Sequence, residues 1–282
     1  MRLATFRTDM AKQGRRARTY VALGVMAGLP ILMTFAFKYG GRGERGDRDP
    51  TELFRLARQS GIVVPAAALA ALSGFFLIIV VAVFSGDAVA SEASWGNLRY
   101  LLVRPVSRAR LLAGKTVVAF LLAWIATVSI SLVGLAAGTI AFGLHPIDVP
   151  LIVHQSVGQL LSHLVVVTAY IAWSMSAVVA FGVMLSTMTD APAGAIFAAA
   201  GFGIVAEILD AIQPLGFLRY GLPLHYLNAW TDFFRPTNSI IGGASASFAR
   251  AEMWRGVAVQ VPYVVVFLAV AFWWFGRKDV LS

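Results

Sequence analysis

The sequence predicts an all-α, polytopic integral membrane protein. Its 282 residues are 59% hydrophobic and only 13% charged, with a mean hydropathy of +0.76. Soluble domains contain roughly 25% charged residues, and a soluble chain of this composition would expose large apolar patches. Apolar segments of about 20 residues, the length that crosses a bilayer, recur along the sequence. We therefore expect a single transmembrane domain over residues 1–282.

Six apolar segments are candidates for membrane-spanning helices. They contain Gly, Pro, Ser and Thr, which membrane helices tolerate better than soluble helices do. The segments cover residues 20–37, 63–84, 117–142, 160–185, 193–212 and 257–275. Residues 213–256 are expected to be an outer segment, because side chains such as Arg219 and Asp232 make it too polar to face lipid. Its Tyr and Trp residues suit the membrane interface.

The distribution of basic residues predicts that both termini are cytoplasmic. An even number of spans puts both ends on one side, which has thirteen Lys and Arg residues against ten on the other. Residues 1–19 are dense in positive charge, and the first helix usually dominates topology. Their apolar residues recur at helical spacing, which indicates an interfacial amphipathic helix, with a plain basic anchor as the alternative. The lack of a small-residue cleavage site favours a retained first span over a signal peptide.

Residues 85–116 form the predicted cytoplasmic loop between the second and third spans. We expect a short amphipathic helix over residues 94–103, because its large apolar residues recur at spacings of three and four. Arg104 precedes Pro105, and a residue before proline is pushed out of the helical region. Ser107 can then cap a new helix that continues into the third span.

The same loop ends in Gly114, Lys115 and Thr116, which are the last residues of a nucleotide-binding P-loop. A P-loop needs a glycine five positions earlier, where this chain has Ala109. Two adjacent leucines between them favour helix, which uses the backbone N–H groups that a phosphate would need. We therefore expect no nucleotide site here, and we expect Lys115 to extend to the lipid head groups.

The order of residues in this loop closely resembles the ABC-2 type permeases, in particular small six-span bacterial permeases without a fused ATPase domain. The shared pattern is a glycine and an acid after the second span, in the order "E…G.L..LL..PVSR..LL.GK", followed by the third span. Its residues here are Gly86, Glu92, Gly96, Leu98, Leu101, Leu102, Pro105, Val106, Ser107, Arg108, Leu111, Leu112, Gly114 and Lys115. The six-span layout and the stretch "LPLHYLNAW" before the last span agree with the resemblance.

The resemblance implies an export permease of the bacterial inner membrane and no catalytic role for this chain. It would pair with a second copy or a sister permease, and ATP and Mg would be bound by a separate ATPase subunit. No cofactor or metal is expected on the chain itself. The residues expected to couple it to the ATPase are Glu92, Trp95, Leu98, Arg99, Leu102, Arg104, Pro105 and Arg108. From the residues alone, the predicted helix could equally lie on the inner leaflet.

The net charge of +9 points to lipid head groups and not to nucleic acid, because the basic residues lie between apolar runs. Two pairs of residues are candidates for the substrate path, Phe75 with Phe76 and Glu207 with Asp210. Acidic residues in spans usually face protein or water, so Glu207 could attract a cationic substrate or help gate the exit, unless it is simply hydrated. Adjacent helical positions point about 100° apart, so at most one of the two phenylalanines is expected to face the path.

Two other functions are compatible with the sequence. A membrane enzyme would need a polar cluster at the interface, and "YGLPLHYLNAWTDFF" is the only candidate, through His225 and Asp232. A sensor or assembly partner would need no transport path. The spacing of nine between His145, His154 and His163 puts neighbours on opposite helix faces, which does not suit a shared metal.

Overall fold

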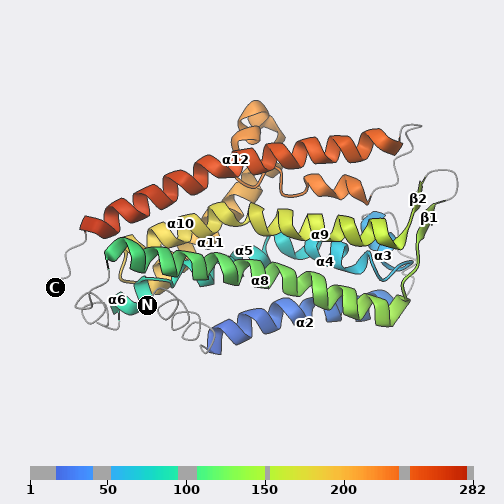
Figure 1. Ribbon diagram of the computed structural model, residues 1–282, viewed down its shortest axis with the longest axis horizontal. Helices are drawn as coiled ribbons and strands as arrows, with labels where there is room; N and C mark the ends of the chain where they lie inside the picture. Colours follow the sequence, from blue (N-terminus) through green and yellow to red (C-terminus); the bar gives the residue numbers. More distant parts are fainter. Residues whose placement is uncertain (1–16, 41–51, 95–106, 150–152, 235–241, 278–282) are drawn as a thin grey trace.

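The computed structural model describes residues 17–40, 52–94, 107–149, 153–234 and 242–277. The described chain is helical apart from one short antiparallel hairpin, and its long helices run side by side as a bundle (Figure 1). The elements are α2 (Ala17–Tyr39), α3 (Glu52–Ala57), α4 (Val64–Ser73), α5 (Phe76–Gly86), α6 (Ala90–Ser94), α8 (Arg108–Phe142), β1 (Ile147–Val149), β2 (Val153–Gln155), α9 (Val157–Ser174), α10 (Ser176–Met188), α11 (Pro192–Ala211), η1 (Gln213–Gly221), η2 (Ala229–Phe233) and α12 (Gly242–Arg277).

The outward faces of the bundle are apolar. Among the described residues, five helical stretches are long and apolar enough to cross a membrane, or six if the bent pair α4–α5 is one span. In both α2 and α12, only 17% of the most apolar eighteen-residue window is buried. Phe197 on α11 and Trp254 on α12 are among the large exposed side chains. Helices this apolar and this exposed are stable against lipid and not against water, so the fold is that of a multi-pass membrane protein.

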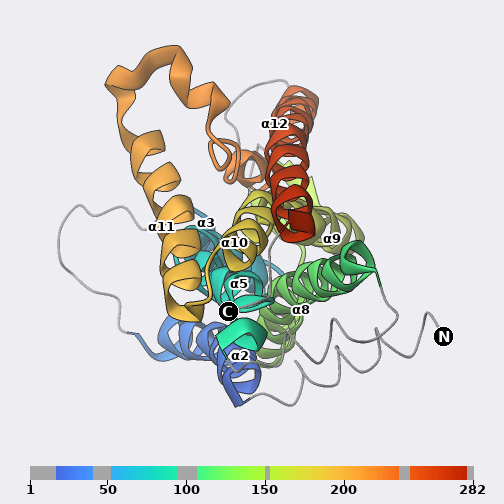
Figure 2. The same cartoon turned by 90° about the vertical axis from the view of Figure 1, so that its left-hand side faces the viewer.

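Helices α8 and α10 hold the bundle together. Helix α8 packs on α2, α4, α5 and α9, while α10 packs on α5, α11 and α12. Figure 1 places α6, the first turn of α8 and the last turn of α12 at one end of the bundle, here called the α6 end. The β1–β2 hairpin lies at the opposite, hairpin end. Figure 2 shows α11 and α12 diverging, with the segment that contains η1 and η2 between them.

Two predicted spans are not continuous helices. The span expected over 63–84 is divided into α4 and α5, which are bent by 63° relative to each other. The span expected over 160–185 is interrupted at Met175, between α9 and α10. The second interruption has a partner in the core, because the buried Gln260 side chain of α12 accepts a hydrogen bond from the Ala177 backbone N–H at 3.2 Å.

Two other spans extend beyond their predicted limits. Helix α8 begins at Arg108, so the predicted helix that follows Ser107 and continues into the third span is confirmed. Helix α12 begins at Gly242 and not at residue 257. At 1.5 Å per residue, a helix of 35 residues is about 52 Å long, well beyond a hydrocarbon core of about 30 Å. Apolar segments mark only the part of a helix inside the lipid, so sequence hydropathy underestimates both helices. The interfacial helix expected over 1–19 lies almost entirely outside the described residues.

Candidate functional site

The α4–α5 break, residues 73–76, interrupts the second span beside α11. Gly74 follows the last residue of α4, and Phe75 has a non-helical backbone (φ −136°, ψ −65°). The rings of Phe75 and Phe76 meet edge to face, with 5.4 Å between their centroids, and the residues are 48% and 42% exposed. The expectation that only one ring faces the path assumed a continuous helix, which the break removes.

Glu207 of α11 lies against this break. A methyl group on Gly74 would lie 3.7 Å from Glu207 Oε2. Glu207 Oε1 is buried and has no hydrogen-bond partner among the described residues, and the same holds for Ser73 Oγ in the last turn of α4. A buried polar atom without a partner costs about 1–3 kcal/mol. Glu207 therefore lies beside the turn that carries Phe75 and Phe76, so three of the four substrate-path candidates predicted from sequence are at this break.

Asp210, the fourth candidate, lies three residues further along α11 in a different setting. Its Oδ1 is within hydrogen-bond distance of His225 Nδ1 and lies 3.4 Å from Arg219 Nε. The imidazole of His225 also packs edge to face on Tyr220 and Tyr226. Asp210 is thus paired with groups of the outer segment, and sequence spacing gave no signal for this because the partners follow the end of the helix.

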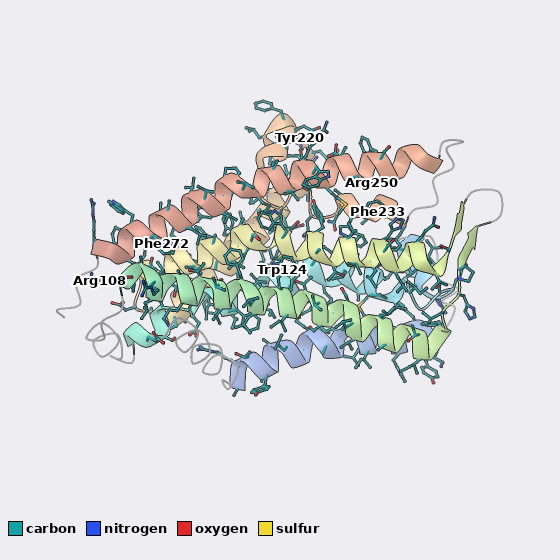
Figure 3. All side chains as sticks on the ribbon, in the orientation of Figure 1. Arg108, Trp124, Tyr220, Phe233, Arg250 and Phe272 are labelled. Carbon is teal, nitrogen blue, oxygen red and sulfur yellow. The ribbon has the colours of Figure 1, made fainter. Side chains whose placement is uncertain are left out.

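His163 and His145 lie in other settings. His163 of α9 stacks on Phe233 with 4.8 Å between ring centroids (Figure 3 labels Phe233). The backbone carbonyl of His145 accepts a hydrogen bond from Ser60 Oγ at 2.7 Å. In the described part of the chain, no three His, Cys, Asp or Glu side chains are arranged to hold a metal ion. The side chain of Asp232 lies outside the described set.

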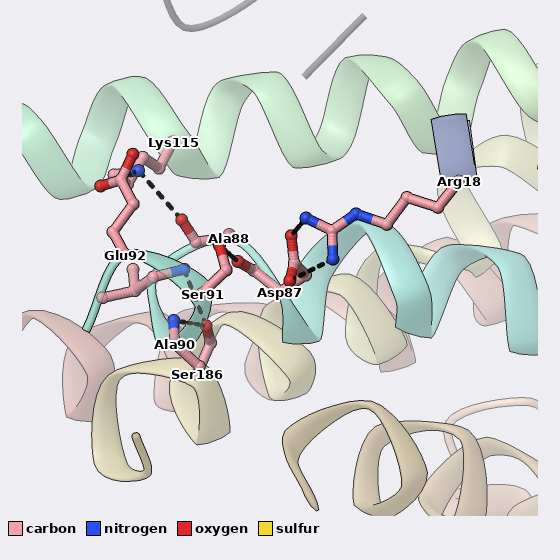
Figure 4. A network of polar contacts seen from close by, with 9 residues as sticks. Arg18, Asp87, Ala88, Ala90, Ser91, Glu92, Lys115 and Ser186 are labelled. Atoms are coloured by element: carbon pink, nitrogen blue, oxygen red, sulfur yellow. Dashed lines mark hydrogen bonds and ion pairs between the residues drawn. The ribbon is translucent and has the colours of Figure 1, made fainter. Parts of the chain in front are cut away.

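At the α6 end, a polar network surrounds the turn that follows α5 (Figure 4). Arg18 of α2 forms an ion pair with Asp87. Burial raises the pKa of the Asp87 carboxyl above its usual value, against the opposing effect of the Arg18 guanidinium. On α10, Ser186 Oγ accepts hydrogen bonds from the backbone N–H groups of Val89 at 2.8 Å and Ala90 at 2.9 Å.

Lys115 of α8 completes the network. Its Nζ lies 2.6 Å from Glu92 Oε2 and donates a hydrogen bond to the Ala88 carbonyl at 3.0 Å. The Lys115 side chain is only 6% exposed, so the expectation that it extends to the lipid head groups is wrong. Glu92 lies 23 residues earlier, and its negative charge keeps the ammonium inside the bundle. Gly114, Lys115 and Thr116 lie within α8, in the helical conformation that the adjacent leucines predict.

Of the residues expected to couple to an ATPase, only two are described. Glu92 lies in α6 and pairs with Lys115, while Arg108 opens α8 and donates a hydrogen bond to the Gly276 carbonyl of α12 at 3.2 Å. The remaining six lie outside the described residues: Trp95, Leu98, Arg99, Leu102, Arg104 and Pro105. The network at the α6 end therefore surrounds the base of the segment on which the coupling prediction depends.

A shallow groove of about 420 Å³ lies between α2 and α8, near the hairpin end. Its lining is apolar except for Thr34 and for Lys38 and Tyr39 at the last turn of α2. None of the substrate-path candidates lines this groove. Its apolar walls suit an acyl chain of the surrounding bilayer.

Long apolar helices with lipid-facing sides, two interruptions and ion pairs at one end define a polytopic helical membrane protein. The chain belongs to the family described as "Protein of unknown function (DUF2705)", whose pattern matches residues 57–281. Among curated proteins, none matches this chain.

Proposed function

We propose that this chain is the membrane-spanning permease subunit of an ATP-driven exporter in the bacterial inner membrane. Two permeases would form the path, as a homodimer or with a sister subunit, and two separate ATPase subunits would bind ATP and Mg. Six spans with both termini in the cytoplasm would place the α6 end inside the cell. ATP-driven closure of the ATPase pair would push on residues 94–103 and tilt the two permease halves.

The observation that carries the proposal is the ion pair between Lys115 and Glu92 at the base of this segment. In the same network, Asp87 pairs with Arg18 of α2, and the backbone N–H groups of residues 89 and 90 bond to Ser186 of α10. A force applied to residues 95–106 would therefore reach α5, α8 and α10 together. Helix α5 leads directly to the α4–α5 break beside Glu207. Packed helices transmit displacements because protein interiors are dense and bistable interfaces amplify small shifts.

Co-purification in mild detergent tests the proposal. The wild type is compared with Trp95→Glu plus Leu98→Glu, which puts two charges on the apolar side of the predicted helix. Asn97→Glu plus Tyr100→Glu is the matched control, because it adds the same charge at the same spacing on the other side. We expect a nucleotide-binding subunit to co-elute with the wild type and the control and to be lost from the first variant. If no ATPase co-elutes with any of the three proteins, the proposal is overturned.

A membrane enzyme is the second candidate, and the Asp210–His225 pair favours it. A carboxylate bonded to one imidazole nitrogen orients the ring and leaves the other nitrogen for proton transfer. Tyr220, which is 60% exposed and points away from the bundle in Figure 3, would lie at the entrance. Replacing His225 and Asp232 together tests this function: full activity of the double variant in cells would exclude it.

A further inference from the structure

The α4–α5 break combines three features that favour a positively charged ligand. The first is the carboxylate of Glu207, whose Oε1 is buried without a hydrogen-bond partner in the described chain. Asp210, the nearest acid on the same helix, is already paired with His225 and Arg219. Helices α5 and α10, which pack on α11, and α4, which ends beside Glu207, contain no Lys, Arg or His within their bounds. Segment η1 also packs on α11, and its Arg219 is the one that pairs with Asp210. Glu207 thus has no counter-charge of its own on these helices.

The second feature is the end of α4. A helix of ten residues stops at Ser73, and its last carbonyl groups give the C-terminus a partial negative charge. Ser73 is 1% exposed, and its Oγ has no hydrogen-bond partner among the described residues. Interrupted membrane helices use such carbonyl ends to hold cations. The carboxylate and the helix end therefore add to the same negative potential at one place.

The third feature is the aromatic pair. Phe75 and Phe76 lie within three residues of Ser73, and both are more than two-fifths exposed, whereas most other side chains of this span are buried. The face of a phenylalanine ring attracts cations, and its body offers apolar contact area. A small inorganic ion would not use these rings, whereas a cation with a bulky apolar body would contact both the rings and the carboxylate.

We infer that the α4–α5 break is a binding site for amphiphilic organic cations, with Glu207 as the charged partner and Phe75 and Phe76 as the apolar one. Only the statement that this site lies on an export path rests on the proposed function, because binding itself needs no ATPase. The inference assigns a substrate class to that path. Gly74 is part of the site because a side chain there would fill the space beside the carboxylate.

The test is equilibrium binding of radiolabelled tetraphenylphosphonium to the full chain in detergent. Tetraphenylborate, which has the same shape and the opposite charge, is the matched probe. The variants are Glu207→Gln, Gly74→Leu and Asp190→Asn, the last a charge control two residues before α11 begins. Gly74 has an ordinary helical backbone (φ −76°, ψ −15°), so leucine adds bulk there without backbone strain. Size-exclusion profiles and circular dichroism check that each variant folds.

We expect saturable binding of the cation to the wild type and to Asp190→Asn. Glu207→Gln should weaken it at least about tenfold, because an ionic partner inside apolar surroundings is lost. Gly74→Leu should weaken it similarly with the carboxylate intact. Equal binding to Glu207→Gln, or equal affinity for tetraphenylborate, would overturn the inference. If the cation binds but no ATPase co-elutes, the binding site is confirmed and the exporter function is refuted. If an ATPase co-elutes but the cation does not bind, the exporter function stands and the binding site is refuted.

Discussion

Lys115 of α8 and Glu92 of α6 form a buried ion pair, with 2.6 Å between Nζ and Oε2 and side chains that are 6% and 12% exposed. Removing one partner of a buried pair leaves the other charge without compensation, which typically costs about 3–5 kcal/mol. Lys115→Met should therefore lower the free energy of unfolding strongly. In Lys115→Met plus Glu92→Leu, most of that loss should be recovered. Thermal unfolding in detergent measures both, and strictly additive losses would contradict a direct interaction.

Asp87 predicts a pH dependence of stability. It follows α5, outside the membrane-spanning helix, and burial raises its pKa above 3.8 in spite of Arg18. A carboxyl with a raised pKa in the folded state stabilises the fold fully below its unfolded pKa, and this contribution is lost as the pH rises through the folded value. Acidification from about pH 7 towards about pH 4 should thus stabilise the wild type relative to Asp87→Asn. The opposite trend in unfolding midpoints would mean that the Arg18 pair outweighs burial.

Gly256 allows α12 to approach the outer segment closely. A methyl group there would lie 2.7 Å from Tyr226 Cβ and would meet the hydroxyl of Tyr170, which donates a hydrogen bond to the Tyr226 carbonyl at 2.5 Å. Gly256→Ala should destabilise the fold by about 1–3 kcal/mol, as overpacking does. Gly276→Ala in the same helix is the control, because no atom from another part of the described chain lies within 4 Å of the added methyl group. If both substitutions have the same effect on unfolding, close packing at Gly256 is refuted.

The long helices are predictable from the sequence, because hydropathy measures what a lipid-facing helix requires over about 20 residues. Hydropathy could not locate the α4–α5 break. Residues 63–84 contain no charged residue and only one serine, and Gly74 is an ordinary residue for a membrane helix. The bend depends on how α4 and α5 pack on α8 and α11, which is tertiary information.

The candidate site was predictable only in part. Glu207 and Asp210 were found because acidic residues in apolar segments are rare. The sequence does not predict that the two acids lie in different settings. Asp210 pairs with His225, which belongs to the outer segment after α11, where helical spacing no longer applies. Likewise, a lysine at the start of an apolar run favours the membrane surface, and only the fold brings Glu92 to within ion-pair distance of Lys115.

Gln260 should be the most sensitive polar residue of α12. Its Oε1 accepts a hydrogen bond from the Ala177 N–H at the α9–α10 break, and its Nε2 donates one to the Pro223 carbonyl of the outer segment. Gln260→Leu keeps a similar volume but leaves both backbone groups buried without a partner, at about 1–3 kcal/mol each. Gln260→Glu keeps an acceptor for Ala177 and loses the donor for Pro223.

The two Gln260 variants therefore separate the two bonds. Unfolding midpoints should fall in both, and Gln260→Leu should affect α10 as well as the outer segment. Limited proteolysis should cut residues 213–234 faster in both variants, because the Pro223 bond that holds this segment to α12 is absent from each. Hydrogen exchange at the first turn of α10 should increase only in Gln260→Leu. Unchanged exchange there would mean that the break at Met175 is held by packing alone.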